Sequence, residues 1–148
     1  MLASSMCAAR RAPQFEYDTA RVMAFMRTLI PGLQVPADAV AMGLIRGGRL
    51  AAGVVFEGIN SFNCWVHVAV KPGARVTRDA LRAVFTYPFI VCGVRRVSGY
   101  VDESNSAARR FDEHLGFREE TRLKGAAKDG GDVIVYVMWR HECRYLEN

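Results

Sequence analysis

The chain has 148 residues, of which 51% are hydrophobic and 24% charged, and its formal net charge is +5. This length fits one domain with a single core, and no internal repeat or low-complexity tract suggests another organisation. The moderate positive charge suits an anionic ligand, and the arginines spread from Arg75 to Arg110 favour a small ligand that carries phosphate.

The first half of the chain predicts a helix followed by three antiparallel strands. Residues 1–16 are expected to form an irregular N-terminal arm, and residues 17–148 a single domain. A helix is predicted over 17–30, where apolar residues recur on one face before Pro31 and Gly32 stop it. Strands are predicted at 40–46 and 49–57, joined by a tight turn at Gly47 and Gly48, and a third at 62–70.

In the second half, helices and strands alternate. A helix is predicted over 78–87, capped by Thr77 and ended by Pro88. A strand over 94–101, a helix over 105–115, and strands over 117–123 and 133–140 follow. This order predicts an α/β fold (an α+β mixed sheet), with a central mixed β-sheet and helices on both faces.

The cysteines and the N-terminus indicate the compartment. Cys7, Cys64, Cys92 and Cys143 are far apart, with no Cys-x-x-Cys spacing and no histidine at a metal-ligand interval, so we expect reduced structural thiols and no metal. The N-terminus lacks the features of a signal peptide, and no later segment could span a bilayer. We therefore expect a cytoplasmic protein that does not bind membranes.

The segment 97–117 is the most informative part of the sequence. A short apolar strand is followed by Ser104, a natural N-cap, and by a helix that Gly116 ends. Asn105 then falls in the first helical turn, beside the carboxyl ends of the strands, where open α/β sheets bind ligands. The alternative for Asn105 is a second capping residue beside Ser104.

Asn105 and Ala108, followed by Leu115, Gly116 and Phe117, form a pattern that resembles the GNAT superfamily of acyl-CoA-dependent N-acyltransferases. The predicted order of elements is similar to that of the GNAT fold from about residue 17 onward. The resemblance implies acetyl-CoA as cosubstrate, with Asn105 and Ala108 beside its pantetheine arm. The C-terminal region looks most like a branch that modifies protein N-termini and small amines and is also encoded by phages and prophages.

In that fold two parallel strands separate, and the resemblance implies that the backbone of Val68, Ala69 and Val70 pairs with pantetheine. The pyrophosphate would lie on the next turn, at the start of a helix. The four candidates there are Arg75, Val76, Thr77 and Arg78. Arg78 stands where the family motif has glycine, a departure that either compensates with charge or blocks the pocket. The alternative for Arg75 and Arg78 is two solvated arginines.

The catalytic groups are less clearly indicated. The family often has a carboxylate at the position of Cys64, so we name His67, Glu57 and Glu103 as candidate bases, each with a structural alternative. A tyrosine that protonates the leaving thiolate in many relatives is replaced by Asp112. Because an ionised aspartate is a poor proton donor, Tyr136 and Tyr100 are possible substitutes.

Two functions follow from these residues. The first is an N-acetyltransferase that transfers an acetyl group from acetyl-CoA to a primary amine, of a small molecule or a protein N-terminus, by direct attack. The alternative is a catalytically inactive GNAT-like module that binds nucleic acid or a protein partner. The mild charge and the lack of alternating aromatic and arginine residues argue against nucleic acid. Monomer and homodimer both remain open.

Overall fold

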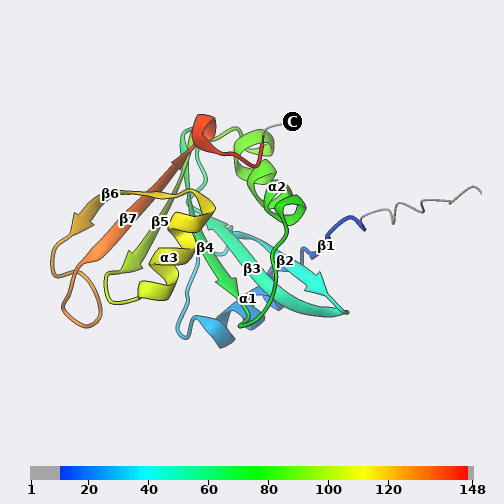
Figure 1. Ribbon diagram of the computed structural model, residues 1–148, viewed down its shortest axis with the longest axis horizontal. Coiled ribbons are helices and arrows are strands. Elements are labelled where there is room, and N and C mark those ends of the chain that lie inside the picture. Colours follow the sequence, from blue (N-terminus) through cyan, green and yellow to red (C-terminus); the bar gives the residue numbers. More distant parts are fainter. Residues whose placement is uncertain (1–10, 147–148) are drawn as a thin grey trace, which may run out of the picture.

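The computed structural model describes residues 11–146, which fold around one seven-stranded sheet (Figure 1). The strand order is β1-β2-β3-β4-β5-β7-β6. The strands are β1 (Gln14–Glu16), β2 (Val40–Arg46), β3 (Arg49–Glu57), β4 (Asn63–Val70), β5 (Arg96–Asp102), β6 (Arg118–Leu123) and β7 (Val133–Trp139). The helices are α1 (Thr19–Leu29), α2 (Arg78–Thr86), a π-helical turn η1 (Tyr87–Val91), α3 (Ser106–Leu115) and a 3-10 turn η2 (Arg140–Glu142).

The predicted mixed sheet with helices on both faces is confirmed. Every pair of neighbouring strands is antiparallel except β4 and β5, which run parallel. The β2–β3 hairpin turns at Gly47 and Gly48, whose φ angles of 58° and 75° suit glycine. Its strands have the predicted bounds, because the turn and the alternating apolar residues set both ends locally.

The predicted N-terminal arm is wrong for its last residues. Gln14–Glu16 form strand β1, which pairs antiparallel with β2 at the edge of the sheet. Phe15 of β1 packs against the core, so this short strand belongs to the domain although its sequence is too brief to show periodicity. The prediction for residues 1–10 lies outside the described residues.

Helix α1 covers one face of β2, β3 and β4. Asp18 caps the helix by accepting a hydrogen bond from the Arg21 amide, and Val22 and Met26 are fully buried. Gly53 of β3 lets α1 lie close, because a Cβ atom there would be 2.7 Å from Cγ of Met26. The apolar stripe read from the sequence is therefore the contact face of α1.

Helices α2 and α3 cover separate parts of the opposite face, which carries the main core (Figure 1). The largest buried side chains there include Phe56, Phe89, Tyr136 and Met138. Pro88 does not end the helical segment as predicted. The chain continues through the wider turn η1, in which the Cys92 amide donates to the Tyr87 carbonyl, a spacing that tolerates the missing N–H of proline.

The residues after β7 turn back across α2 and α3. The last strand ends at Trp139, one residue earlier than predicted, and η2 leads into this C-terminal segment. The Tyr145 ring stacks on Phe85 of α2 at 5.3 Å between centroids, and its hydroxyl donates to the Leu115 carbonyl of α3 at 2.8 Å. The segment thereby ties the two helices together.

Three further features of the described part of the chain concern its cysteines, its helices and its metal-binding residue types. Cys64, Cys92 and Cys143 carry free thiols. No helix within residues 11–146 is long and apolar enough to cross a bilayer. Across the same residues, no three histidine, cysteine, aspartate or glutamate side chains are grouped closely enough to hold a metal ion.

Candidate active site

The parallel strands β4 and β5 pair at one end only. Their ladder has three residue pairs and stops at Trp65 and Ser98, although β4 continues to Val70 and β5 to Asp102. The backbone that follows Trp65 therefore has no ladder partner on its β5 side, whereas its β3 side stays paired as far as Val70. This one-sided opening is the geometry that an extended ligand needs to bind as an additional strand.

Polar side chains hold the closed end of the opening. The Ser98 hydroxyl on β5 donates to Oδ1 of Asn63 on β4 at 2.5 Å, and Nε of Arg96 donates to the Ser98 hydroxyl at 3.1 Å. Arg96 also pairs with Glu120 at 2.8 Å. Because Ser98 is almost fully buried, its two hydrogen bonds are partly shielded from water, and they join β4 to β5 at the point where the strands separate.

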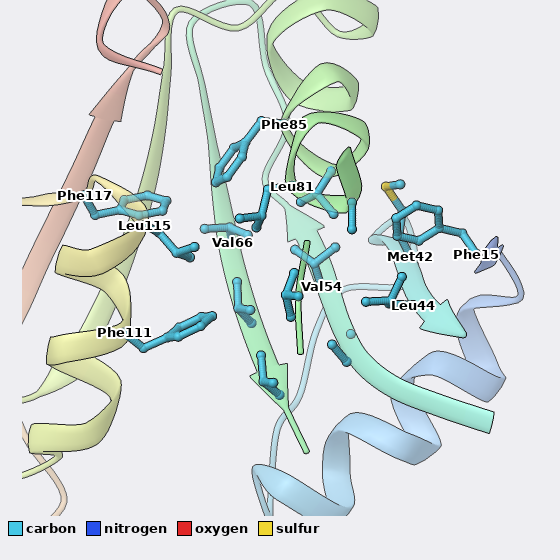
Figure 2. A pocket seen from close by; sticks show the side chains of 17 residues that line it. Phe15, Met42, Leu44, Val54, Val66, Leu81, Phe85, Phe111, Leu115 and Phe117 are labelled. Atoms are coloured by element: carbon cyan, nitrogen blue, oxygen red, sulfur yellow. The ribbon is translucent and has the colours of Figure 1, made fainter. Parts of the chain in front are cut away.

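On the α2/α3 side, the opening meets an apolar cavity of about 40 Å³ (Figure 2). Val66 and Val68 of β4 line it, and so do Phe111 and Leu115 of α3, whose side chains point toward β4. Leu81 and Phe85 of α2 belong to the same lining. The predicted residues Val70 and Val76 also line this cavity, whereas Ala69 packs against α1 on the other face.

On the α1 side, side chains from three strands meet beside the opening. Nε2 of His67 on β4 lies 3.2 Å from Oε2 of Glu57 on β3, and both side chains are mostly buried. The rings of Tyr100 on β5 and His67 meet edge to face at 90°, with centroids 5.6 Å apart. The ring of Trp65 also lies edge to face with Tyr100, with centroids 6.0 Å apart. The structure thus brings His67 and Glu57 together inside an aromatic wall.

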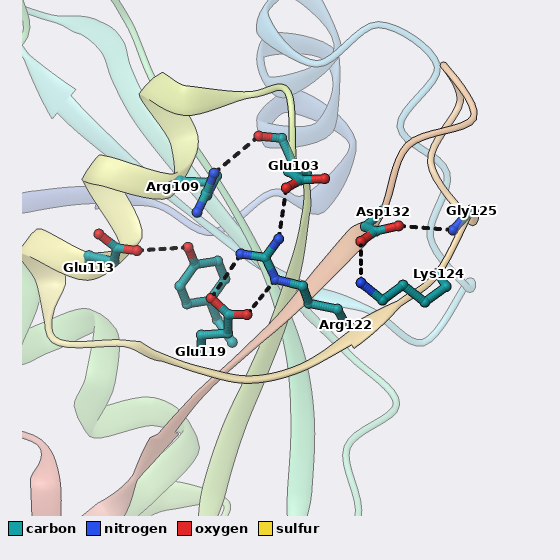
Figure 3. A network of polar contacts seen from close by, with 9 residues as sticks. Glu103, Arg109, Glu113, Glu119, Arg122, Lys124, Gly125 and Asp132 are labelled. Atoms are coloured by element: carbon teal, nitrogen blue, oxygen red, sulfur yellow. Dashed lines mark hydrogen bonds and ion pairs between the residues drawn. The ribbon is translucent and has the colours of Figure 1, made fainter.

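Glu103, the third candidate base, lies elsewhere (Figure 3). Its carboxylate pairs with Arg122 of β6 at 2.7 Å, and Arg122 also binds Glu119 at 2.6 Å. Strand β6 is two strands away from β5 on the side opposite β4, so these contacts point Glu103 away from the opening. Glu103 therefore does not share a site with His67 and Glu57.

The turn that was predicted to bind the pyrophosphate has fewer free positive charges than its sequence suggested. Thr77 caps α2 by accepting from the Ala80 amide at 3.2 Å, as expected. Arg75 is exposed, but Nη2 of Arg78 donates to the Arg144 carbonyl at 2.5 Å, and the guanidinium lies 5.6 Å from the Tyr145 ring centre. Asp79 adds a negative charge to the first turn. The C-terminal segment thus engages the guanidinium of Arg78, the residue that stands where the family motif has glycine.

Asn105, not Ser104, is the N-cap of α3. Its Oδ1 accepts a hydrogen bond from the Ala108 amide at 3.2 Å. Ser104 precedes the cap, and its hydroxyl bonds Asp129 in the β6–β7 loop. The Asn105 oxygen is therefore engaged by the helix, and Nδ2 is the donor group of this side chain that could serve a ligand.

The structure bears on two residues considered as proton donors for the thiolate, Tyr136 and Asp112. The Tyr136 hydroxyl is buried and donates to Glu113 at 3.0 Å, which gives it a structural role (Figure 3). Asp112 is half-buried on α3, and burial, followed by the nearby charge of Glu113, raises its pKa from 3.8 to about 7. Burial therefore favours the neutral carboxylic acid of Asp112 over the ionised form expected from its ordinary pKa.

That Tyr100 and Trp65 together line the site beside His67 was not among the expectations from the sequence. Burial raises the pKa of Tyr100, and the charges of Glu57 and Asp102 add to this effect, so its hydroxyl stays protonated at neutral pH. Alternation along β4 and β5 could have placed both aromatic residues on the His67 face, but the pairing register that brings the strands together was needed as well.

Comparisons with known proteins identify the fold. No known protein family matches the sequence, and no curated protein matches it. Among solved structures, a mutant form of the spermidine/spermine N-acetyltransferase SpeG from Vibrio cholerae aligns with a TM-score of 0.71 and 15% identity, over 90% of this chain and 97% of that chain. A chimera of that SpeG and hSSAT gives a TM-score of 0.72 and 14% identity, over 93% and 100% of the two chains.

A probable acetyltransferase aligns with a TM-score of 0.61 and 19% identity, over 72% of this chain and 64% of that protein. The two SpeG structures are N-acetyltransferases and the third neighbour is a probable acetyltransferase, and the chain shares their GNAT-like fold. The expectation of that fold is confirmed.

Proposed function

We propose that the protein is an acyl-CoA-dependent N-acyltransferase that transfers an acetyl group to a primary amine by direct attack. The observation that carries this proposal is the one-sided opening between β4 and β5, with an apolar cavity on one face and the His67–Glu57 pair on the other. An opening between two chemically different faces suits two substrates that approach from opposite sides of the sheet.

The thioester donor enters from the α2/α3 side. Its pantetheine arm carries amide groups that can pair with the free edge of β4 at Val68, Ala69 and Val70, as an added strand does. In this proposal Nδ2 of Asn105, at the start of α3, donates to the arm. The pyrophosphate then meets the amides at the start of α2, where exposed Arg75 supplies positive charge.

The amine enters from the α1 side, where the acceptor proton is removed. An amine attacks only when it is neutral, so a base must take its proton. His67 is well placed because Glu57 accepts from its Nε2–H, which leaves Nδ1 of the same ring as the acceptor. Glu57 also favours a cationic amine at this face, and the faces of Trp65 and Tyr100 suit the same charge.

The reaction balances with the groups present. The carbon–nitrogen bond forms as the amine attacks the thioester carbon, and the carbon–sulfur bond breaks as the thiolate of coenzyme A leaves. The amine attacks in its neutral form after releasing its extra proton to water, and it then passes one proton to His67 as the carbon–nitrogen bond forms. The thiolate takes one proton from water or from an acid, for which Asp112, whose pKa is raised by burial, is the candidate. The acceptor class remains a small amine, as the spermidine N-acetyltransferases that share the fold suggest, or a protein N-terminus.

The proposal is tested by binding and turnover together. Acetyl-CoA at a hundred times its dissociation constant should stabilise the folded protein by about 2.7 kcal/mol, which thermal unfolding detects. Release of free thiol with a panel of polyamines, small amines and peptides then reports transfer. A thermal shift without turnover of any amine would favour the alternative, a catalytically inactive module, which the engaged Arg78 and the acidic Asp79 support. No thermal shift at millimolar acetyl-CoA would contradict cofactor binding.

A further inference from the structure

A solvent-open groove lies at the end of β5 where its ladder with β4 begins. Its volume is about 720 Å³, within the range of about 300–1,000 Å³ that is usual for ligand sites. Arg95, which lines the groove, directly precedes the first ladder pair, Asn63 and Arg96. Ile90, Trp139, Arg140, His141 and Leu146 belong to the same lining. The opening lies at the other end of this ladder, beyond Trp65.

The groove is separate from the path proposed for acyl-CoA. Within residues 11–146, no residue that lines the groove also lines the apolar cavity beside the opening. Ile90 belongs to η1, which follows the last residue of α2, whereas the turn proposed for the pyrophosphate precedes the first. Since α2 has nine residues, its two ends are roughly 13 Å apart. The groove is therefore a second surface of the molecule that the transferase reaction does not use.

Two arginines of the groove have no counter-charge. Within residues 11–146, the side chains of Arg95 and Arg140 form no ion pair and no hydrogen bond. The guanidinium of Arg95 lies over the ring of Phe62, 4.9 Å from its centre. Both arginines are exposed, so their N–H groups are free to bind an anion.

The acidic groups next to the groove are already neutralised. Glu120 pairs with Arg96 at 2.8 Å, and Glu142 pairs with Arg118 at 3.1 Å. Glu142 also lies 3.8 Å from Nε2 of His141. Because each carboxylate has its own arginine, the charge of the two groove arginines remains uncompensated and favours a negatively charged partner.

Exposed aliphatic side chains adjoin these charges. Ile90 is 52% exposed, and the next residue, Val91, is 68% exposed. Leu146 lines the groove from the C-terminal segment and is only partly buried. Large apolar side chains that gather beside a groove are typical of docking surfaces. The groove therefore offers aliphatic contacts together with positive charge.

The aromatic rings near the groove are not free to stack on a nucleobase. The guanidinium of Arg96 lies over the Trp139 ring, 5.3 Å from its centre, and the His141 ring is 6.4 Å away. Phe62 has Arg95 over its ring. Proteins that hold single-stranded nucleic acid need free aromatic faces for stacking, whereas an aliphatic side chain of a peptide needs only apolar contacts. The groove thus suits a peptide better than a nucleic acid.

We propose that this groove binds an acidic peptide segment of a partner protein. Carboxylates of the segment pair with Arg95 and Arg140, because a guanidinium offers two parallel N–H donors to a carboxylate. One aliphatic side chain of the segment packs against Ile90 and Leu146. Binding here requires neither acyl-CoA nor transferase activity, and it leaves the opening accessible.

A defined peptide tests the proposal. The probe is a short N-acetylated peptide in which glutamates flank a single leucine, and its blocked N-terminus prevents it from acting as an acceptor amine. We expect saturable binding by titration calorimetry, weakened by added salt. The same peptide with lysines in place of the glutamates should not bind. Failure of the acidic peptide to saturate the protein at millimolar concentration would overturn the proposal.

Matched variants separate a local site from a general charge effect. Arg140→Glu should weaken peptide binding by about tenfold or more, because a charged hydrogen-bonding partner is lost. Arg49→Glu makes the same change in net charge at the exposed β2–β3 hairpin, and it should change the affinity by less than about twofold. Equal losses in the two variants would show that the peptide senses only net charge and would overturn the site. If thermal unfolding shows that Arg140→Glu does not fold, Arg140→Ala should give a smaller loss in the same direction.

The aliphatic contact has its own pair of variants. Ile90→Ser should weaken binding of the acidic peptide about fivefold, because its leucine loses an apolar partner. Leu123→Ser removes an apolar side chain of similar exposure, 50%, from β6 and should leave the affinity unchanged. Native affinity in Ile90→Ser would contradict packing of the peptide against η1.

The two tryptophans of the chain report the two surfaces separately. Trp139 lines the groove, whereas Trp65 lies beside Tyr100 at the opening. In Trp65→Phe the acidic peptide should still change the tryptophan emission, and in Trp139→Phe it should not. The reverse pattern would place the peptide at the opening and overturn the proposal. Displacement of the peptide by a short oligothymidylate that binds more tightly would identify a nucleic-acid site and would overturn it as well.

Discussion

The carboxylate of Glu57 lies 3.2 Å from Nε2 of His67, diagonally across the β3–β4 ladder in which Glu57 faces Trp65 and His67 faces Val55. A diagonal pair of this kind is within reach on one face of an antiparallel sheet. It holds the imidazole by one nitrogen at the edge of the opening, so that the other nitrogen can accept a proton.

His67→Gln should lower kcat by about 10²–10⁴, because the amine then loses its proton acceptor. Glu57→Gln should cost less, since the ring is retained, and should change the pH dependence of kcat/KM. Steady-state rates across pH 6–9 measure both effects. Glu103→Gln, which removes a carboxylate paired with Arg122 and outside the site, is the matched control. Equal losses in all three variants would show that His67 is structural.

Asp112→Asn should raise stability at pH 8 but not at pH 3. Because the folded-state pKa is about 7 and the ordinary value 3.8, the folded protein binds the proton more tightly, and stability falls as pH rises from about 4 to 7. Above pH 7 the ionised side chain costs on the order of 1–2 kcal/mol after allowance for its partial exposure. Urea unfolding at both values measures the difference. A pH-independent difference would contradict the raised pKa.

The same variant should slow turnover if Asp112 protonates the leaving thiolate. Asparagine keeps the shape of the side chain but cannot supply the proton. An Asp112→Asn enzyme that is more stable at pH 8 and yet slower would separate the catalytic role from the structural one. Unchanged kcat would show that water protonates the thiolate.

Asn105→Ser should keep α3 capped while removing the amide donor. Serine and asparagine are about equally good N-caps, so the free energy of unfolding should stay within about 0.5 kcal/mol of the native value. Affinity for coenzyme A should fall about tenfold, the loss of roughly one good hydrogen bond. Asn105→Ala, which loses both functions, should also unfold about 1 kcal/mol more easily. If calorimetry shows that Asn105→Ser binds coenzyme A with the native affinity, Asn105 acts only as a helix cap.

Arg78→Ala should weaken the fold more than the cofactor site. The substitution removes the hydrogen bond to the Arg144 carbonyl and the contact with the Tyr145 ring, worth about 0.5–1 kcal/mol in all at an exposed position. Affinity for coenzyme A should stay within about twofold, whereas Arg75→Ala, at the free exposed arginine, should lower it and reduce its salt dependence. A loss above tenfold in Arg78→Ala would show that Arg78 leaves the C-terminal segment to bind phosphate.

Local sequence patterns predicted some features of the candidate site. The alternation along β4 indicates that His67 faces away from Val66 and Val68, and the structure agrees. The sequence also named Glu57 and His67 as separate candidates. Their contact depends on the β3–β4 register, which no local pattern states.

Other features of the site depend on packing between distant segments of the chain and could not be predicted from the sequence. Asp112 has an ordinary sequence context, and only burial against the rest of the fold raises its pKa. Arg78 looks free at the start of a helix until Tyr145, 67 positions later in the chain, packs beside it. The cavity under α2 likewise exists only once Ala52 and Ala80, from separate elements, face each other.

The sequence by itself determined the order of the main helices and strands from α1 to β7, the hairpin at Gly47 and Gly48, and the helix end at Gly116, because periodicity and backbone preference act over a few residues. The tertiary structure alone decided where β4 and β5 separate, which charges face the opening and which helix-start arginine is engaged. Those outcomes depend on contacts between residues far apart in the chain, whose free energies no short window contains.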